Sequence, residues 1–356
     1  MKKLLVILSA LLVVLSLTAC APKEEEPTYE LALVTDIGTI DDKSFNQGAW
    51  EGVKQYAEEN DITYQYYQPA EATTAAYVEA IGQAVDGGAK VVVTPGFMFA
   101  PAILEAQDLY PEVKFVLLDA DPHDEDYTEF RIEDNVYSIY YAEEQSGFLA
   151  GYAAVIDGYT NLGFMGGMAV PAVVRFGHGF VQGAEVAAVE LGVDVTVKYE
   201  YLNSFAPDDA HKTKALAWYS EGVEVIFVAA GGAGLSVMAA ADTLDAAKVI
   251  GVDVDQSNLS ESVITSAMKG LTTSVYAALE DYYADEFKGG VIETLDVTKD
   301  GVGLPEDLSR FSTFNKAKYD EIYAKLVAGT VVVKKDAAKV VDLVLTKVVV
   351  TVIGSE

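Results

Sequence analysis

Short apolar runs typical of buried β-strands alternate with helix patterns along this chain, and the series occurs twice. Near-continuous apolar strands separated by helices are characteristic of parallel sheets that are covered on both faces. We therefore predict an α/β fold of two doubly wound parallel-sheet lobes of similar size. The predicted strands lie at residues 31–34, 62–67, 91–93, 113–118 and 136–141, and again at 162–165, 193–202, 223–228, 249–252 and 263–267.

The first 20 residues have the form of an export signal. Two lysines precede an apolar run, residues 4–17, that is too short to span a bilayer. The run leads into Leu17-Thr18-Ala19-Cys20, which resembles the cleavage box of bacterial lipoproteins. That resemblance implies cleavage before Cys20 and diacylation of its thiol. An ordinary signal peptide followed by an unmodified thiol is the alternative.

On the lipoprotein interpretation, residues 1–19 are a signal peptide and residues 20–29 are a lipidated tether. The membrane contact is then the lipid anchor alone, on the outer face of the bacterial cytoplasmic membrane. Cleavage leaves 337 residues with 22 basic and 55 acidic side chains, a balance of −33. This acidity disfavours binding to nucleic acid or to anionic lipid, and the length favours two domains.

Signatures of enzymes and cofactor sites are absent from the sequence. There is no P-loop, no HExxH and no GxSxG motif. His123, His178 and His211 are far apart along the chain, so we predict no zinc site. Glycines 177, 179 and 183 have the wrong spacing for a dinucleotide loop and favour close helix packing instead. We therefore predict a protein that is not an enzyme and that needs no cofactor.

Polar, aromatic and glycine residues recur where predicted strands end. Ligands of open α/β sheets bind at this edge, so we expect these residues to line a cleft between the lobes. An acid, a ring and an amide would suit a ligand with a flat face and polar edges. Taken singly, each residue has a structural alternative: a helix cap, a core ring or a solvated lysine. The candidates are Asp36, Phe45, Asn46, Asp119, Phe205, Gly231, Gly232, Asp253 and Lys269.

Four motifs together resemble the basic membrane protein (BMP) family of lipoproteins, typified by purine nucleoside receptor A. The resemblance implies a fold like that of type I periplasmic binding proteins, with two lobes joined by a multi-strand hinge. It also implies an ABC-transporter substrate-binding protein that acts as a monomer and delivers nucleosides to a permease and its ATPase. The motifs run from Asp36 through Phe45 to Asn46, from Gly163 to Gly167, from Gly251 through Asp253 to Gln256, and from Gly301 to Leu304.

The resemblance also implies roles for the candidate residues. Phe45 and Phe205 match the aromatic pair that stacks on the base, while Asp36 and Asn46 match the groups that face its edge. The ribose would be held by Asp253 and Lys269, with the turn at Gly231 and Gly232 allowing the backbone to approach and Asp119 as a further carboxylate. Inosine, guanosine or adenosine is the ligand that this pattern implies.

Two other functions remain open at this stage. The first is a binding protein of the same fold for a sugar or a small signalling molecule. The second is a nucleoside hydrolase with an acidic cleft.

The expected domain limits are 30–140 with about 272–310 for the first lobe, and 141–271 with about 311–356 for the second. The chain would then cross between the lobes near Tyr140, Leu271 and Arg310. The role of the Val-rich tail is left open.

Overall fold

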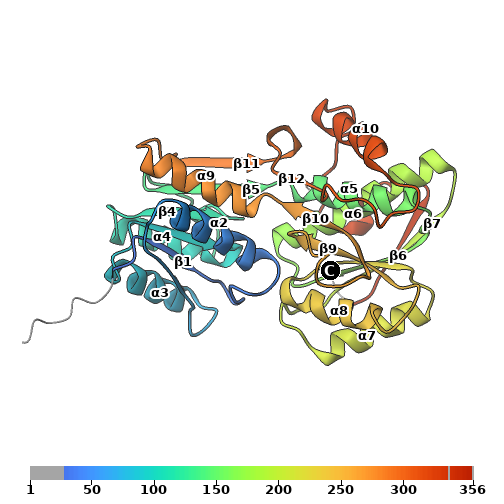
Figure 1. Cartoon of the computed structure of the whole chain (residues 1–356), viewed down its shortest axis with the longest axis horizontal. Coiled ribbons are helices and arrows are strands. Elements are labelled where there is room, and N and C mark those ends of the chain that lie inside the picture. The colour runs from blue at the N-terminus through green and yellow to red at the C-terminus, as the bar shows by residue number, and fades with distance from the viewer. Residues whose placement is uncertain (1–27, 336, 355–356) are drawn as a thin grey trace, which may run out of the picture.

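The computed structural model describes residues 28–335 and 337–354, so the predicted signal peptide and Cys20 lie outside the described residues. The chain forms two α/β lobes that lie side by side (Figure 1). All strand pairs are parallel except that between β10 and β12. The predicted fold class, two parallel-sheet lobes, is therefore confirmed.

The first lobe holds a six-stranded sheet in the order β11-β5-β4-β3-β1-β2. Residues at alternate positions of its central strands face opposite sides: Leu31 and Leu33 pack with α2, while Ala32 and Val34 pack with α3 and α4. Its elements are β1 (Leu31–Val34), α2 (Phe45–Glu59), β2 (Tyr64–Tyr67), α3 (Thr74–Asp86), β3 (Val91–Pro95), η1 (Phe97–Phe99), α4 (Ala100–Leu109), β4 (Lys114–Leu118), β5 (Val136–Tyr141), α9 (Leu271–Tyr283) and β11 (Val291–Leu295).

The second lobe holds a seven-stranded sheet in the order β12-β10-β9-β8-β6-β7-β13. The Val-rich tail supplies the extra edge strand, β13, which runs parallel to β7. The elements of this lobe are α5 (Glu143–Ile156), β6 (Asn161–Gly166), α6 (Pro171–Leu191), β7 (Val195–Tyr201), α7 (Asp209–Ser220), β8 (Val225–Ala229), η2 (Gly231–Ala233), α8 (Gly234–Ala241), β9 (Lys248–Asp253), β10 (Val263–Lys269), β12 (Val302–Gly303), α10 (Lys316–Val327), η4 (Val340–Asp342) and β13 (Val348–Val352).

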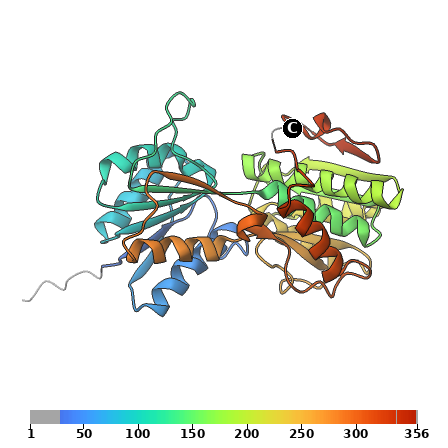
Figure 2. The same cartoon turned by 90° about the horizontal axis from the view of Figure 1, so that it is seen from above.

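Three segments pass between the lobes, and they gather in a narrow junction (Figure 2). The first lies between β5 and α5, and the second between β10 and α9. The third was expected near Arg310, but β11 belongs to the first sheet and β12 to the second, so the chain crosses between Leu295 and Val302, through η3 (Val297–Lys299). The apolar part of β12 is too short for the sequence pattern to reveal its sheet.

Helices α5 and α6 lie against each other at very short range. A Cβ at Gly147 or Gly151 would overlap a carbonyl of α6, and a Cβ at Gly179 or Gly183 would overlap a carbonyl of α5. The prediction that Gly177, Gly179 and Gly183 serve close packing is thus confirmed, since a Cβ at Gly177 would overlap the Tyr199 hydroxyl. Among the described residues, no helix combines the length and apolar character that a membrane crossing requires.

Candidate functional site

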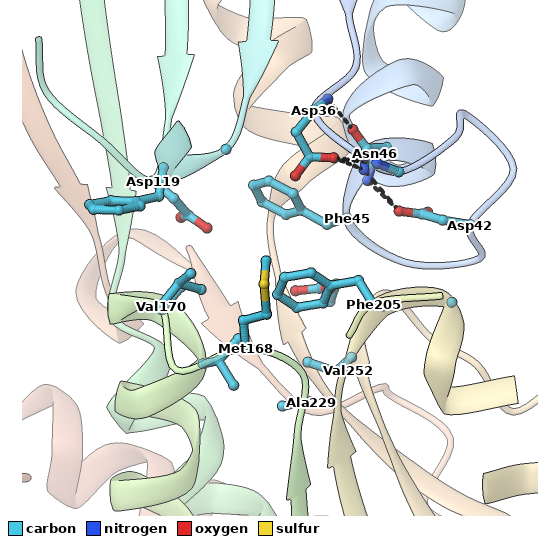
Figure 3. A pocket seen from close by; sticks show the side chains of 18 of the residues that line it. Asp36, Asp42, Phe45, Asn46, Asp119, Met168, Val170, Phe205, Ala229 and Val252 are labelled. Carbon is cyan, nitrogen blue, oxygen red and sulfur yellow. Dashed lines mark hydrogen bonds between the residues drawn. The ribbon is translucent and has the colours of Figure 1, made fainter. Parts of the chain in front are cut away.

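A cavity opens between the lobes, at the carboxyl ends of the strands, and its empty space, counted together with the solvent at its mouth, is about 790 Å³. The structure brings all nine sequence-predicted residues to its walls. Figure 3 labels Asp36, Phe45, Asn46, Asp119 and Phe205 among them. They are Asp36, Phe45, Asn46, Asp119, Phe205, Gly231, Gly232, Asp253 and Lys269.

The loop after β1 forms a polar corner of the first-lobe wall. Oδ1 of Asp36 accepts hydrogen bonds from the Gly38 N–H at 2.8 Å and from Asn46 Nδ2 at 2.9 Å, whereas the other carboxylate oxygen points into the pocket (Figure 3). Gly38 is required here because a Cβ would overlap the Asn46 amide. Burial raises the pKa of Asp36 to about 6, although these two hydrogen bonds oppose the rise.

Phe45 is placed by the first turn of α2. Asp42 caps this helix, because its carboxylate accepts from the backbone N–H groups of Ser44, Asn46 and Gln47 at 2.8–3.1 Å. The Ser44 side chain makes no cap and instead donates to Oδ2 of Asp253 in the other lobe at 2.5 Å. The capped turn therefore fixes the Phe45 ring, which is half-buried, on the pocket wall.

Phe205 reaches the pocket from the loop between β7 and α7 of the second lobe. Its ring lies on Gly167, where any Cβ would overlap it, and its carbonyl accepts from the Ala233 N–H at 2.8 Å. Gly231 has a left-handed backbone (φ 54°) and lies beside the same ring. Gly167, after β6, thus makes room for the Phe205 ring. Gly231 and Gly232, after β8, pack beside the same loop, a role that their expected contact with the ligand did not include.

Asp119 and Asp253 occupy equivalent places, one directly after β4 and the other at the end of β9. Both have left-handed backbones, with φ of 63° and 67°. Such conformations are costly for non-glycine residues and concentrate at functional sites. Burial raises the pKa of Asp253 to about 6, opposed by Lys269 and by the Ser44 hydroxyl.

Lys269 sits in a buried cluster of charges behind the pocket. Its ammonium lies 2.5 Å from Asp119 and 3.0 Å from Glu143, and Glu143 also binds Arg175 at 2.5 Å. The ammonium is 4.7 Å from the centre of the Phe45 ring. Burial disfavours the charged lysine, but the two carboxylates outweigh burial and raise the pKa of Lys269, so it remains a cation.

The carboxylates of this cluster respond to burial in opposite ways. Burial raises the pKa of Asp119 although Lys269 opposes it, whereas Lys269 and Arg175 overcome burial and lower the pKa of Glu143. Oδ1 of Asp119 has no hydrogen-bond partner in the described part of the chain, so an acceptor is left open at the pocket.

Sequence reasoning missed part of the site. Glu143 and Arg175 were not predicted, although Glu143 starts α5 two residues after β5 ends and so follows a strand end, as several of the predicted residues do. It also missed an apolar wall, because apolar residues near strand ends resemble ordinary core. That wall comprises Met168, Val170, Ala172, Val173, Phe176, Ala229 and Val252. Within residues 28–335 and 337–354, His, Cys, Asp and Glu side chains form no group of three suited to a metal ion.

The chain is similar to known proteins over most of its length. A family model described as "ABC transporter substrate-binding protein PnrA-like" (Bmp) matches residues 29–337. A "CD4+ T-cell-stimulating antigen" of Listeria monocytogenes is 32% identical over 85% of this chain and 87% of its own length. An "ABC transporter nucleoside-binding protein BmpA" of Lactococcus lactis is 32% identical over 83% of this chain and 87% of its own length.

The fold is similar to that of solved structures. A solute-binding protein of an ABC transporter system from Aeropyrum pernix has a TM-score of 0.74 and 23% identity, and the match covers 86% of this chain and 94% of that one. A solute-binding protein from Conexibacter woesei has a TM-score of 0.67 and 21% identity, covering 86% and 99%. These likenesses support the periplasmic-binding-protein fold with its two lobes.

Proposed function

The chain belongs to the Bmp family of PnrA-like ABC transporter substrate-binding proteins, and from this premise we propose that it captures purine nucleosides between its lobes and delivers them to an ABC permease and its ATPase. The family is one of substrate-binding proteins and not of enzymes. The observation that carries the proposal is the pair of half-buried rings, Phe45 and Phe205, which line one cavity from opposite lobes.

The geometry fits the parts of a nucleoside in turn. A planar base between the two rings would gain roughly 1–3 kcal/mol of stacking per ring. The free oxygen of Asp36 would accept from an N–H on the base edge, while Asn46 holds that carboxylate in place. Vicinal ribose hydroxyls would donate to Asp253 and to the open oxygen of Asp119. Four carboxylates against one lysine on the walls would repel a phosphate, so a nucleoside is favoured over a nucleotide.

In this proposal, Gly231, Gly232 and Lys269 have more limited roles than the resemblance implies. Gly231 and Gly232 shape the Phe205 loop while lining the pocket. Lys269, already paired with Asp119 and Glu143, orients Asp119 and adds positive charge beside the ribose site. Since each ring belongs to a different lobe, only the closed arrangement makes both stacks, and the ligand therefore shifts the open–closed balance.

We further propose that the mature protein is a monomer anchored through diacylated Cys20 on the outer face of the cytoplasmic membrane. The lipoprotein-like box at residues 17–20 supports this assignment. Mass spectrometry of the mature N-terminus should find the lipid on Cys20, and Cys20→Ala should release the protein from membranes. An unmodified N-terminus at another residue would reject the anchor, and light scattering would test the monomer.

Calorimetric titration of the soluble protein with inosine, guanosine, adenosine, ribose and galactose tests the ligand class. We expect nucleoside binding that falls more than tenfold in Phe45→Ala and in Phe205→Ala, with both variants folded. Phe130→Ala is the matched control, because its ring is 57% exposed and outside the cavity. Undiminished affinity in both pocket variants would reject the stacking site, and binding of a sugar without any nucleoside would favour the sugar-binding alternative.

A further inference from the structure

Within residues 28–335 and 337–354, three hydrogen bonds cross from one lobe to the other beside the cavity. Two of them involve a carboxylate of the cavity wall, Lys269 with Asp119 and Ser44 with Asp253. The third runs from Nε2 of Gln256 in the second lobe to the carbonyl oxygen of Lys43 in the first, at 2.7 Å. Gln256 is 2% exposed and does not line the cavity, so this bond joins the lobes without depending on a ligand contact.

Gln256 is held rigidly by its own lobe. Its Oε1 accepts from the Val252 N–H at 3.0 Å, and its backbone N–H donates to the Ser266 hydroxyl at 3.0 Å. Gly251 leaves the necessary space, because a Cβ there would lie 2.5 Å from Oε1 of Gln256. With its oxygen fixed on Val252, the carboxamide can only present its N–H group to the first lobe.

The acceptor in the first lobe is also set by its backbone. Lys43 has a left-handed conformation (φ 61°), and its N–H donates to Oε1 of Gln47 at 3.2 Å. Lys43 directly precedes Ser44 and Phe45, while Gln256 follows Asp253 by three residues. The bond therefore ties the segment that carries one stacking ring to the segment that carries the opposite carboxylate.

We propose that Gln256 is a positioning residue that stabilises the closed arrangement of the lobes, whichever solute fills the cavity. This role of Gln256 rests on the fold and goes beyond the proposed nucleoside specificity. Apparent affinity falls with the fraction of molecules in the binding-competent state. Loss of one net hydrogen bond should therefore lower affinity about two- to tenfold, and speed up ligand release, without removal of any group that touches the ligand.

Gln256→Glu, studied at pH 8, is the sharpest variant. A carboxylate keeps an oxygen for the Val252 N–H but turns its second oxygen toward the Lys43 carbonyl, so that the contact between the lobes changes from a hydrogen bond to a repulsion between two acceptors. Gln256→Leu is the second variant, in case the buried charge prevents folding. Lys43→Ala is the matched control, because it removes a side chain next to the bond and keeps the acceptor carbonyl.

Small-angle scattering without ligand and stopped-flow release of inosine are the measurements. We expect a larger radius of gyration in Gln256→Glu and Gln256→Leu, about two- to tenfold faster release, and no change in Lys43→Ala. If the folded variants showed only a lower melting temperature, with an unchanged radius of gyration and an unchanged release rate, the proposed role of Gln256 would be overturned. The scattering experiment needs no nucleoside, so it stands even if inosine fails to bind.

Discussion

The two lobes share a plan but contribute different chemistry to the cavity. In each sheet the first five strands have the order 2-1-3-4-5; a single 3₁₀ turn follows the third strand, and a left-handed aspartate lies at the end of the fourth. The first lobe nevertheless presents Asp36, Asp42 and Asn46, whereas the second presents mainly Met168, Val170 and Val252 (Figure 3). Topology therefore fixes the positions of the wall residues. In the proposed site, the first lobe would contact the polar edges of the base and the second lobe would mainly supply an apolar surface.

The two rings differ in the same way. Phe45 is fixed by a capped helix and by the buried cation of Lys269, whereas Phe205 lies in a loop and depends on space left by Gly167. The Phe45 ring is thus held by a helix and a buried charge, whereas the Phe205 ring depends on the packing of a loop. Variants that act on one lobe at a time are the means to test this division.

The largest effect is expected at the buried ion pair between the lobes, Lys269 with Asp119. Lys269→Met leaves the buried Asp119 carboxylate without its cation and Glu143 with Arg175 alone, and it should lower the free energy of unfolding by about 3–5 kcal/mol and abolish binding. Urea unfolding measures the loss. Lys198→Met, which breaks an ion pair at the surface with Glu221, should cost only about 0–1 kcal/mol. A similarly small loss for Lys269→Met would mean that the cluster is solvated and that the lobes are not linked by charge.

Next in size are the supporting glycines, one on each lobe. Gly167→Ala should push the Phe205 ring aside and weaken all nucleosides about tenfold alike, because stacking is tolerant of base identity. Gly38→Ala should instead displace the Asn46 amide from Asp36 and alter the discrimination among inosine, guanosine and adenosine. Calorimetry with the three nucleosides separates the two patterns. If both variants changed discrimination equally, the division between a shape lobe and an edge lobe would be wrong.

Much of this arrangement could be predicted from the sequence, because strand ends in parallel sheets meet at one edge. Asp36 and Phe205 stood out because a plain turn requires neither an acid nor a ring there. The charge cluster could not be predicted: Lys269 and Asp119 are 150 residues apart, and their pairing depends on side-chain geometry across two lobes. Met168 and Val170 were missed because apolar residues beside a strand do not reveal whether they face a core or a cavity.

A smaller effect is expected from pH, through one carboxyl on each lobe. The pKa values of Asp36 and Asp253 are about 6, above the ordinary 3.8. Both groups become protonated as pH falls through 6, so they no longer accept from the ligand, and affinity should drop several-fold between pH 7.5 and 5. Calorimetry across this range measures the drop in affinity. Asp36→Asn and Asp253→Asn should each remove the part of that drop that its own carboxyl causes. Affinity that stayed flat in the wild type would exclude both carboxylates as acceptors.

The same two groups should have the opposite effect on the unliganded protein. An acid whose pKa is raised by folding destabilises the folded state when ionised, and this penalty disappears as pH falls from above 6 toward 4. The wild type should therefore gain stability relative to the Asp36→Asn/Asp253→Asn double variant over that interval. Thermal unfolding at pH 7.5 and 5 measures the difference. If the wild type instead lost stability relative to the double variant as pH falls, these carboxyls would make favourable charged contacts when the cavity is empty.

The smallest effect on binding is expected from removal of β13, the extra edge strand of the second sheet, which has no counterpart in the first. The tail beyond the family match, residues 338–354, adds β13 to the edge of the second sheet, where Glu185 accepts from the N–H groups of Thr346, Lys347 and Val348. Deletion of residues 338–356 should lower the free energy of unfolding by at least about 1.5 kcal/mol, because buried Val340 and Val348 leave the core. Inosine affinity should stay within about twofold, because no residue of the tail lines the cavity.

Glu185→Ala provides a graded form of the same test, since it removes only the acceptor that holds the start of β13. It should lower stability less than the deletion does, again without a change in affinity. If either variant weakened inosine binding more than tenfold while remaining folded, the edge strand would be coupled to the cavity through β7 and the second-lobe wall that it supports. The extra strand would then be part of the reason why the two lobes, built on one plan, act differently on the ligand.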